Sequence, residues 1–358
     1  MSDELNKTVD VREGEELDAK LVDAAMKDHI DGLSGDPVIR QFAGGNSNLT
    51  YSIQYGDRKF VLRRPPFGTR PKSGHSMIRE FRVMNALKPV FPAVPDTYFH
   101  VSDEDSAFGV EYYVMEQVLG RKLERDIPEE WGFGEEEGRK LCLSFFDKLI
   151  DLHKVDFKAI GLGDFGKPEG YVERQVLGWN RRYEKALTDD VESFEDVRTW
   201  LEKNMPDGEV GHSILHGDYR LDNVILDEKD PFKIIAVLDW EISALGDPLM
   251  DLGNTLAYWS QPSDSEQVKM MRMQPCLAPG MLTREEICDL YAEKTGYDLS
   301  YFPYYHVYGV FRLAVILQQI YYRYYHGQSK NPAFASFAGR TNLLGNYARE
   351  LIEKSHIG

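Results

Sequence analysis

The chain has 358 residues and a mass of 41.1 kDa, which is more than one hydrophobic core usually organises, so we expect two lobes. Apolar residues make up 42% and charged residues 28%, which is ordinary for a globular protein and argues against a disordered or fibrous chain. The 42 Lys and Arg against 59 Asp and Glu give a formal charge of −17. This charge argues against nucleic acid and anionic membranes as partners.

Cysteine usage and the chain start indicate a cytoplasmic protein. Three cysteines, Cys142, Cys276 and Cys288, lack metal-ligand or redox spacing, so we expect buried thiols in a reducing compartment. The first residues show no basic and then apolar signal. The richest apolar run, residues 307–322, is interrupted by Arg312 and two glutamines, so we expect no membrane span.

The first third of the chain predicts a small, mostly antiparallel sheet. Residues 1–16 are acidic and polar and predict a loose tail, and apolar spacing from Leu17 predicts a helix that ends at Gly32. Short alternating segments bounded by turn residues predict strands over residues 38–42, 49–55, 59–64, 97–101 and 110–116. One amphipathic helix is predicted over residues 76–87, with apolar positions 77, 81, 84 and 87.

Beyond Gly120, apolar spacing of three to four residues predicts a larger helical lobe. The predicted helices cover residues 135–152, 172–187, 193–203, 284–295, 304–326 and 335–353. A hairpin of two short buried strands, 224–226 and 234–238, interrupts them. We therefore predict an α+β protein with a small antiparallel sheet lobe carrying one helix over residues 1–117 and a helical lobe over residues 118–358.

Polar residues suited to metal binding and proton transfer lie on both sides of that hairpin. Asp218 lies in a short loop before the first strand, Asn223 directly precedes that strand, and Asp239 follows the second strand. Pairing of the strands brings Asn223 and Asp239 to facing ends, where their oxygens suit Mg²⁺. Phosphoryl transfer needs such a set, because its charged transition state requires an oriented hydroxyl and a neutralising metal. For an isolated Asp218 or Asp239, the alternative is a turn or a helix cap.

These motifs resemble those of the aminoglycoside phosphotransferase and choline kinase-like family, which is related to the protein kinases. The string His216-Gly217-Asp218, followed by Asn223, resembles the catalytic loop of that family. The segment Val-Leu-Asp-Trp-Glu at 237–241 resembles its metal-binding segment, and Gly-Asp-Pro-Leu-Met-Asp-Leu-Gly at 246–253 is similar to its following helix. The resemblance implies a bilobal protein kinase-like fold, with ATP and Mg²⁺ as cofactors.

The resemblance also implies a role for each polar residue. Asp218 would orient the substrate hydroxyl or accept its proton, and Asn223 and Asp239 would hold Mg²⁺. Asp251 would brace the catalytic loop through the loop backbone. His216 is a possible ligand or base, but the interpretation we favour is a loop-bracing histidine that is hydrogen-bonded to backbone.

A glycine-rich loop at residues 43–50 is the candidate phosphate-binding segment. Gly44 and Gly45 allow backbone N–H groups to converge on phosphates, and Asn46, Ser47 and Asn48 add side-chain donors. A Gly-Gly-Asn hairpin turn is the alternative. The family resemblance implies a phosphate loop between these two strands, which favours nucleotide binding.

Arg63 stands where the family usually has lysine. Its side chain shares a strand face with Val61. Arginine still contacts phosphates, but its bulk and its permanent charge change the expected geometry. Its expected partner is Glu80. An exposed charge pair is the alternative, and the neighbouring Arg64 and Arg79 compete for the roles.

The end of the last strand of this sheet is the candidate adenine site. The resemblance implies that the segment Met-Glu-Gln-Val at residues 115–118 is a hinge. Its backbone, at Glu116 and Val118, would hold the adenine base.

Helix 172–187 provides weak candidates for a substrate cleft. Trp179 and Arg182 lie on this helix beside Arg174, Arg181 and Lys185. Basic groups of this kind can receive an anionic acyl carrier or a carboxylate. The alternative is an ordinary rim aromatic on a solvated basic face.

The leading hypothesis is therefore an ATP- and Mg-dependent kinase that phosphorylates a hydroxyl of a small molecule. Gly217 stands where protein kinases carry arginine, which argues against a protein kinase. A catalytically silent nucleotide-binding module is an alternative, favoured only by Arg63. An aminoglycoside or another amino alcohol is one possible acceptor. Segments 63–66, 173–179 and 237–241 look most like the kinase-like domains fused to some acyl-CoA dehydrogenases, which implies a hydroxyacyl acceptor.

Overall fold

The computed structural model describes residues 8–43, 48–66 and 76–357, and the chain divides into two compact units. The first, called the sheet unit, holds the described residues up to Lys122 together with Lys158–Gly163 and Asn223–Ser243. The second, called the helical unit, holds Leu123–Phe157, Asp164–Asp222 and the described residues from Ala244 onward. The sequence predicted one division between the lobes, after residue 117. In the structure, Lys158–Gly163 and Asn223–Ser243 also belong to the sheet unit.

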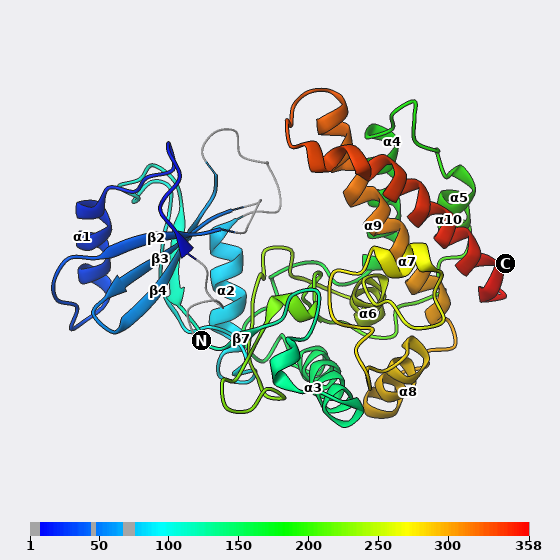
Figure 1. Cartoon of the computed structure of the whole chain (residues 1–358), viewed down its shortest axis with the longest axis horizontal. Coiled ribbons are helices and arrows are strands. Elements are labelled where there is room, and N and C mark those ends of the chain that lie inside the picture. The colour runs from blue at the N-terminus through cyan, green and yellow to red at the C-terminus, as the bar shows by residue number, and fades with distance from the viewer. Residues whose placement is uncertain (1–7, 44–47, 67–75, 358) are drawn as a thin grey trace. The chain divides into compact units, whose positions relative to one another are not determined.

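The sheet unit is built on an antiparallel sheet of six strands, drawn in blue and cyan in Figure 1. The strands are β1 (Thr8–Val9), β2 (Val38–Phe42), β3 (Leu49–Tyr55), β4 (Arg58–Arg64), β5 (Thr97–Val101) and β6 (Tyr112–Glu116). Their order across the sheet is β1-β2-β3-β4-β6-β5. The tight turn between β3 and β4 pairs Tyr55 with Arg58 and so sets Arg63 opposite Thr50.

Residues 8–16 differ from the loose tail predicted for residues 1–16, of which residues 1–7 lie outside the described residues. Thr8–Val9 forms β1 and pairs with β2 at Phe42 and Gln41. The backbone N–H of Arg12 donates to Oε1 of Gln41 at 3.0 Å. The segment is polar and carries no periodic signal, but the edge of the sheet offers backbone groups that any residue type can pair with.

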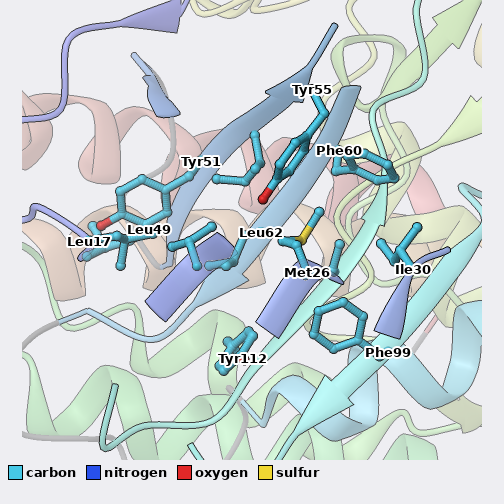
Figure 2. Close-up of a cluster of buried hydrophobic side chains, with 13 residues drawn as sticks. Leu17, Met26, Ile30, Leu49, Tyr51, Tyr55, Phe60, Leu62, Phe99 and Tyr112 are labelled. Carbon is cyan, nitrogen blue, oxygen red and sulfur yellow. The ribbon is translucent and has the colours of Figure 1, made fainter. Parts of the chain in front are cut away.

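One face of the sheet packs on α1 (Ala19–His29), which begins after the N-cap Asp18. Alternate residues of the strands point to this face, as the period of two requires. Figure 2 shows Tyr51, Phe60 and Leu62 from the sheet together with Met26 from α1 in one buried cluster. This cluster is the core of the sheet unit.

The opposite face is covered by α2 (Met77–Leu87). The buried residues of α2 are Met77, Glu80, Val83, Met84 and Leu87. The predicted apolar position Phe81 is only half-buried, and Glu80 lies on the buried side instead. A carboxylate on the buried face of a helix needs a partner, and this one has a partner on the sheet.

The predicted hairpin is present and belongs to the sheet unit. Its strands are β9 (Val224–Leu226) and β10 (Ile234–Val237), and they pair in antiparallel fashion. β7 (Arg121–Lys122) adds a third strand beside β9. Sequence reasoning missed β7 because two residues are too short to show alternation.

The six predicted helices of the helical unit are all present, with ends within two residues of those predicted. They are α3 (Glu135–His153), α4 (Tyr171–Lys185), α5 (Glu195–Lys203), α8 (Arg284–Thr295), α9 (Phe302–Tyr325) and α10 (Phe337–Ser355). The unit also contains α6 (Pro248–Ala257), α7 (Glu266–Met270) and a two-stranded sheet of β8 (Ser213–Leu215) and β11 (Ala244–Gly246). Short 3-10 turns cover Glu129–Trp131, Leu221–Asn223 and Pro332–Ser336. No helix within the described ranges is long and apolar enough to cross a membrane.

Helix α9 organises the helical unit, because both α10 and α6 pack against it. Figure 1 shows α9 and α10 side by side. Helices α6 and α9 approach closely at two glycines. A Cβ atom on Gly309 would lie 2.2 Å from the carbonyl oxygen of Gly253, and one on Gly253 would lie 2.3 Å from that of Tyr305. Only glycine permits this approach, which fixes the position of α6.

Candidate active site

Arg63 is the centre of a charge network in the sheet unit. Its Nη1 donates to Oε1 of Glu80 at 2.6 Å. Its Nη2 donates to Oδ1 of Asp239 at 2.9 Å and to Oε2 of Glu241 at 3.1 Å. Oε2 of Glu241 also accepts from Nδ2 of Asn48 at 3.0 Å. The expected pair of Arg63 and Glu80 is therefore formed, and it extends to the predicted metal ligand Asp239.

The register of β4 explains why Arg63, and not Arg64, occupies this position. Phe60 and Leu62 point into the core beneath α1, so the odd-numbered residues of the strand face α2. Glu80 lies on the buried side of α2. Arg64 falls on the same face as Leu62 and is buried there.

The network carries more negative charge than its one guanidinium neutralises. Three carboxylates, those of Glu80, Asp239 and Glu241, contact Arg63. The Glu80 side chain is 1% exposed, and burial raises its pKa to about 7 against the opposing pull of Arg63. A divalent cation would balance the remaining negative charge.

Asn223 and Asp239 lie at neighbouring ends of the β9 and β10 hairpin. The N–H of Leu238 donates to the carbonyl oxygen of Asn223 at 2.8 Å, next to the pair of Val224 and Val237. Asp239 has a φ of 68°, in the left-handed region that a non-glycine residue adopts at a cost of about 1–3 kcal/mol. Amide and carboxylate oxygens are the donors that Mg²⁺ prefers, so the donor set fits this ion.

In the helical unit, Asp251 of α6 holds the loop that carries Asp218. Its carboxylate accepts the backbone N–H of His216 at 2.7 Å and that of Gly217 at 2.8 Å. Nε2 of His153 lies 3.2 Å from the same carboxylate. These contacts outweigh the effect of burial and hold the pKa of Asp251 below its usual value. An ionised Asp251 therefore accepts both backbone N–H groups of the loop, and its bracing role stays a prediction.

His216 and Gly217 shape the turn before Asp218. The backbone N–H of Asp218 donates to Nδ1 of His216 at 3.2 Å, and the His216 side chain is buried. Gly217 has a φ of 83°, which favours glycine over any larger residue. This contact is the one that the favoured interpretation of His216 expects, and the bracing role stays a prediction.

Sequence reasoning missed Arg220 and Arg312. Nε of Arg220 lies 3.5 Å from Oδ1 of Asp218. Nη2 of Arg312 donates to the carbonyl oxygen of Gly217 at 3.1 Å. The one signal for Arg312 was its position within the long apolar run at residues 307–322, where a buried cation needs a specific partner.

Trp179 and Arg182, the weak candidates for a substrate cleft, contact each other on α4. The guanidinium of Arg182 lies 4.5 Å from the centre of the Trp179 ring, and that of Arg312 lies 5.1 Å from it. The Arg312 side chain contacts both the Trp179 ring and the carbonyl oxygen of Gly217. This one side chain therefore connects α4 to the loop that carries Asp218.

The remaining nucleotide-site predictions are placed in part. Gly44, Gly45, Asn46 and Ser47 lie outside the described residues. In the predicted hinge, the backbone N–H of Glu116 donates to the carbonyl oxygen of Asp96. The backbone N–H of Gln117 donates to the carbonyl oxygen of Lys59. Within the described ranges no partner is found for the N–H of Val118, which leaves it available to a ligand.

The family comparison covers most of the residues that make these contacts. The sequence profile of the phosphotransferase enzyme family matches residues 38–287, which is more than half of the chain and includes Arg63, Asp218, Asp239 and Asp251. The chain belongs to this family. It is therefore a phosphotransferase, as predicted from the catalytic loop and the segment that follows it.

Curated relatives of this phosphotransferase are larger proteins. Acyl-CoA dehydrogenase family member 11 of Rattus norvegicus is 32% identical over 333 residues, which cover 90% of this chain and 42% of the relative. Acyl-CoA dehydrogenase family member 10 of Mus musculus is 33% identical over 336 residues, 92% of this chain and 31% of the relative. The phosphotransferase thus spans less than half the length of these relatives. The predicted resemblance to domains fused to acyl-CoA dehydrogenases is confirmed.

Solved structures confirm the predicted protein kinase-like fold. A Ralstonia eutropha protein provisionally named an aminoglycoside phosphotransferase has a TM-score of 0.79 and 30% identity, with 94% of this chain and 98% of that chain covered. Choline kinase from Cryptosporidium parvum has a TM-score of 0.66 and 11% identity, with 94% and 97% covered. At that identity the likeness to choline kinase concerns the fold alone.

Proposed function

We propose that this phosphotransferase is an ATP- and Mg-dependent kinase that transfers the γ-phosphate to a hydroxyl of a small molecule. The observation that carries the proposal is the pair of hydrogen bonds from the His216 and Gly217 backbone to Asp251. They hold Asp218 on a rigid loop, where its carboxylate can orient a hydroxyl and accept its proton. We further propose that residues 1–117 bind the nucleotide and that residues 118–358 provide catalysis and acceptor binding.

The other residues would hold the nucleotide and its metal. Asn223 and Asp239 would hold Mg²⁺, which when bound would neutralise phosphate charge. Arg63 would contact phosphate oxygens from its place beside Asp239. The backbone of Glu116 and Val118 would hold adenine, and the loop at residues 44–48 would contact phosphates.

Basic and aromatic groups beside the catalytic loop favour an anionic acceptor. Arg182 and Arg312 both lie over Trp179, and Arg312 reaches the loop that carries Asp218. Guanidinium groups bind carboxylates and phosphates well, whereas they repel the ammonium groups of aminoglycosides. The relatives named as acyl-CoA dehydrogenases agree with this chemistry. The acceptor we propose is therefore a hydroxyacyl compound, with an amino alcohol as the alternative.

Steady-state ADP release with Mg-ATP tests the proposal. Hydroxyacyl-CoA compounds of different chain length and hydroxyl position would be compared with kanamycin and choline, with Asp218→Asn as the inactive control. We expect a higher kcat/KM for at least one hydroxyacyl compound than for either amine. A higher value for the amines would overturn the acceptor class. No acceptor-dependent release from either group, in a protein that binds Mg-ATP, would favour the catalytically silent nucleotide-binding module.

A further inference from the structure

A cavity lies in the helical unit, and no residue of the loop 216–218 belongs to its lining. It has a volume of about 600 Å³ and is lined by the 261–265 loop, α8, the start of α9 and the end of α10. Asp218 is absent from its lining, and so are Asp251, Arg220 and Arg312, which contact the loop that carries Asp218. The volume is in the range of cavities that hold small organic molecules.

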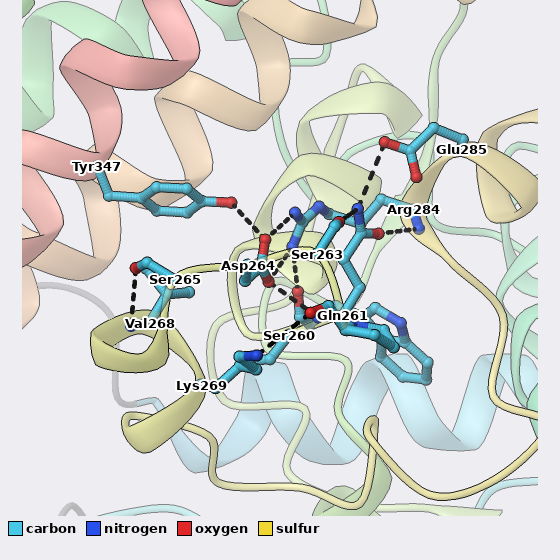
Figure 3. Close-up of polar contacts among 12 residues, drawn as sticks. Ser260, Gln261, Ser263, Asp264, Ser265, Val268, Lys269, Arg284, Glu285 and Tyr347 are labelled. Carbon is cyan, nitrogen blue, oxygen red and sulfur yellow. Dashed lines mark hydrogen bonds and ion pairs between the residues drawn. The ribbon is translucent and has the colours of Figure 1, made fainter.

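One wall of the cavity is a fixed ion pair, shown in Figure 3. Arg284 donates to both carboxylate oxygens of Asp264, and its Nη1 also donates to the carbonyl oxygen of Trp259 at 2.7 Å. The N–H of Gln261 donates to Asp264 at 2.8 Å, and Oη of Tyr347 lies 3.5 Å from the same carboxylate. Arg284 and Asp264 satisfy each other, so this wall offers no free charge to a ligand.

His306 on α9 supplies an unused acceptor in the lining. Its side chain is 8% exposed, and among the described residues its Nε2 has no hydrogen-bond partner. Burial and the nearby Arg284 lower its pKa to about 3, so the ring stays neutral. A neutral imidazole has one nitrogen that donates and one that accepts, so Nε2 can serve as an acceptor. A buried acceptor without a donor is costly unless a ligand satisfies it.

The rest of the lining has an excess of negative charge and an apolar surface. Asp264 and Arg284 neutralise each other. The other charged groups of the lining are one ammonium, that of Lys354, and three carboxylates, those of Glu285, Asp289 and Glu350. These three acidic residues are exposed, so they form the rim of the cavity. Phe302, Pro303, Leu299 and Leu351 provide apolar contact area. Cys288, predicted to be buried, is half-buried here and also lines the cavity.

We propose that this cavity binds a small organic amine whose apolar body carries a hydrogen-bond donor at the end opposite to its ammonium group. The ammonium would lie among Glu285, Asp289 and Glu350 at the rim. The body would pack on Phe302 and Leu351, and the far donor would reach Nε2 of His306. The site is separate from the proposed kinase site and does not depend on the kinase activity.

Tyramine is the probe for this site, because it has an ammonium, a ring and a phenolic donor at the far end. Titration calorimetry would compare it with 2-phenylethylamine, which lacks the donor, and with 3-(4-hydroxyphenyl)propionate, which has the opposite charge. We expect tyramine to bind with a dissociation constant of about 1 mM or tighter. Phenylethylamine should bind roughly two- to tenfold more weakly, since one hydrogen bond is lost. The propionate should not bind.

Variants with matched controls locate the ligand. Glu350→Gln should weaken tyramine binding by roughly two- to fivefold, while Glu353→Gln, on the same helix but outside the lining, should leave it unchanged. His306→Phe should remove the difference between tyramine and phenylethylamine. If His306→Phe does not fold, the Glu350 and Glu353 pair still decides the location. Asp218→Asn should bind tyramine as the unaltered protein does, which separates this cavity from the kinase site.

Three results would overturn the proposal. The first is no saturable binding of tyramine to the unaltered protein. The second is equal binding of the propionate, because it would contradict the charge argument. The third is a result that places the ligand elsewhere. Either an equal loss of tyramine affinity in Glu350→Gln and Glu353→Gln or a loss of tyramine binding in Asp218→Asn would be such a result.

Discussion

Arg63 connects the carboxylate of Glu80 with those of Asp239 and Glu241, which lie far from Glu80 in the chain. The contribution of Arg63 to stability follows from burial. Glu80 is 1% exposed and Arg63 is 12% exposed, so their charges are poorly solvated and depend on each other. The contacts to Asp239 and Glu241 use the second nitrogen of the guanidinium, which a lysine could not reproduce in the same planar geometry.

Replacement of Arg63 by alanine should destabilise the fold as well as weaken ATP use. Arg63→Ala leaves the buried Glu80 without a cation, at a cost of about 3–5 kcal/mol. Arg63→Lys keeps the charge and should retain or raise activity, because the family usually has lysine there. Urea unfolding measures the stability and steady-state ADP release the activity. As a control, Glu80→Gln in the Arg63→Ala background should recover part of the lost stability. No recovery would mean that an unpaired Glu80 is not the cause of the loss.

Asp218 and Asp239 should have separable roles. Asp218→Asn should lower kcat by roughly a hundredfold or more while ATP binding stays near the level of the unaltered protein, because Asp218 acts on the acceptor hydroxyl. Asp239→Asn should weaken Mg-dependent nucleotide binding itself, because a proposed metal ligand is lost. Equilibrium binding of Mg-ATP to each variant separates the two effects. Equal loss of binding in both would contradict this assignment.

At the scale of elements, the contact of α6 with α9 determines where Asp251 lies. Asp251 is two residues before Gly253, and the carbonyl oxygen of Gly253 would be 2.2 Å from a Cβ on Gly309. A side chain at either glycine would push the helices apart. Since Asp251 accepts the loop N–H groups from α6, such a shift would reach the catalytic loop.

Gly309→Ala should therefore destabilise the protein by about 1–3 kcal/mol, the usual cost of overpacking a core. It should also lower kcat, because Asp251 is displaced from the loop. Gly339→Ala is the matched control in α10, where a Cβ meets nothing within 4 Å. That change should be neutral or stabilising by up to about 1 kcal/mol, since alanine favours helix. Urea unfolding of both variants measures the difference, and equal stabilities would show that the helices can separate at no cost.

At the scale of the whole molecule, Mg-ATP should raise the melting temperature. A ligand that binds only the folded state stabilises it by about 2.7 kcal/mol at a hundredfold excess over its dissociation constant. For a protein of this size such a gain corresponds to a shift of several degrees. Thermal unfolding with ATP alone, Mg²⁺ alone and both together measures it, and the largest shift is expected with both. No shift with Mg-ATP at millimolar concentration would count against the kinase and the silent nucleotide-binding module alike.

The sequence by itself determined the long helices, most strands of the large sheet and the residue types of the candidate active site. Apolar spacing predicted the six long helices, because the stripe that a helix buries repeats every three to four residues along the chain. Turn residues and alternation predicted β2, β3 and β5 with their observed bounds. The motif at residues 216–218 and the acid at 239 indicated phosphoryl transfer, because this chemistry requires particular residue types at short spacing.

Only the tertiary structure decided which distant residues meet. Arg63 and Asp239 are 176 residues apart and Arg312 and Gly217 are 95 apart, and no local pattern predicts either contact. The same holds for β1, whose polar residues pair with an edge strand through backbone groups common to all residues. The cavity around His306 joins the 261–265 loop with α8, α9 and α10. The spacing of apolar residues along the chain predicts which face of a helix or strand is buried. It does not predict which other element covers that face, because that depends on how the elements pack together.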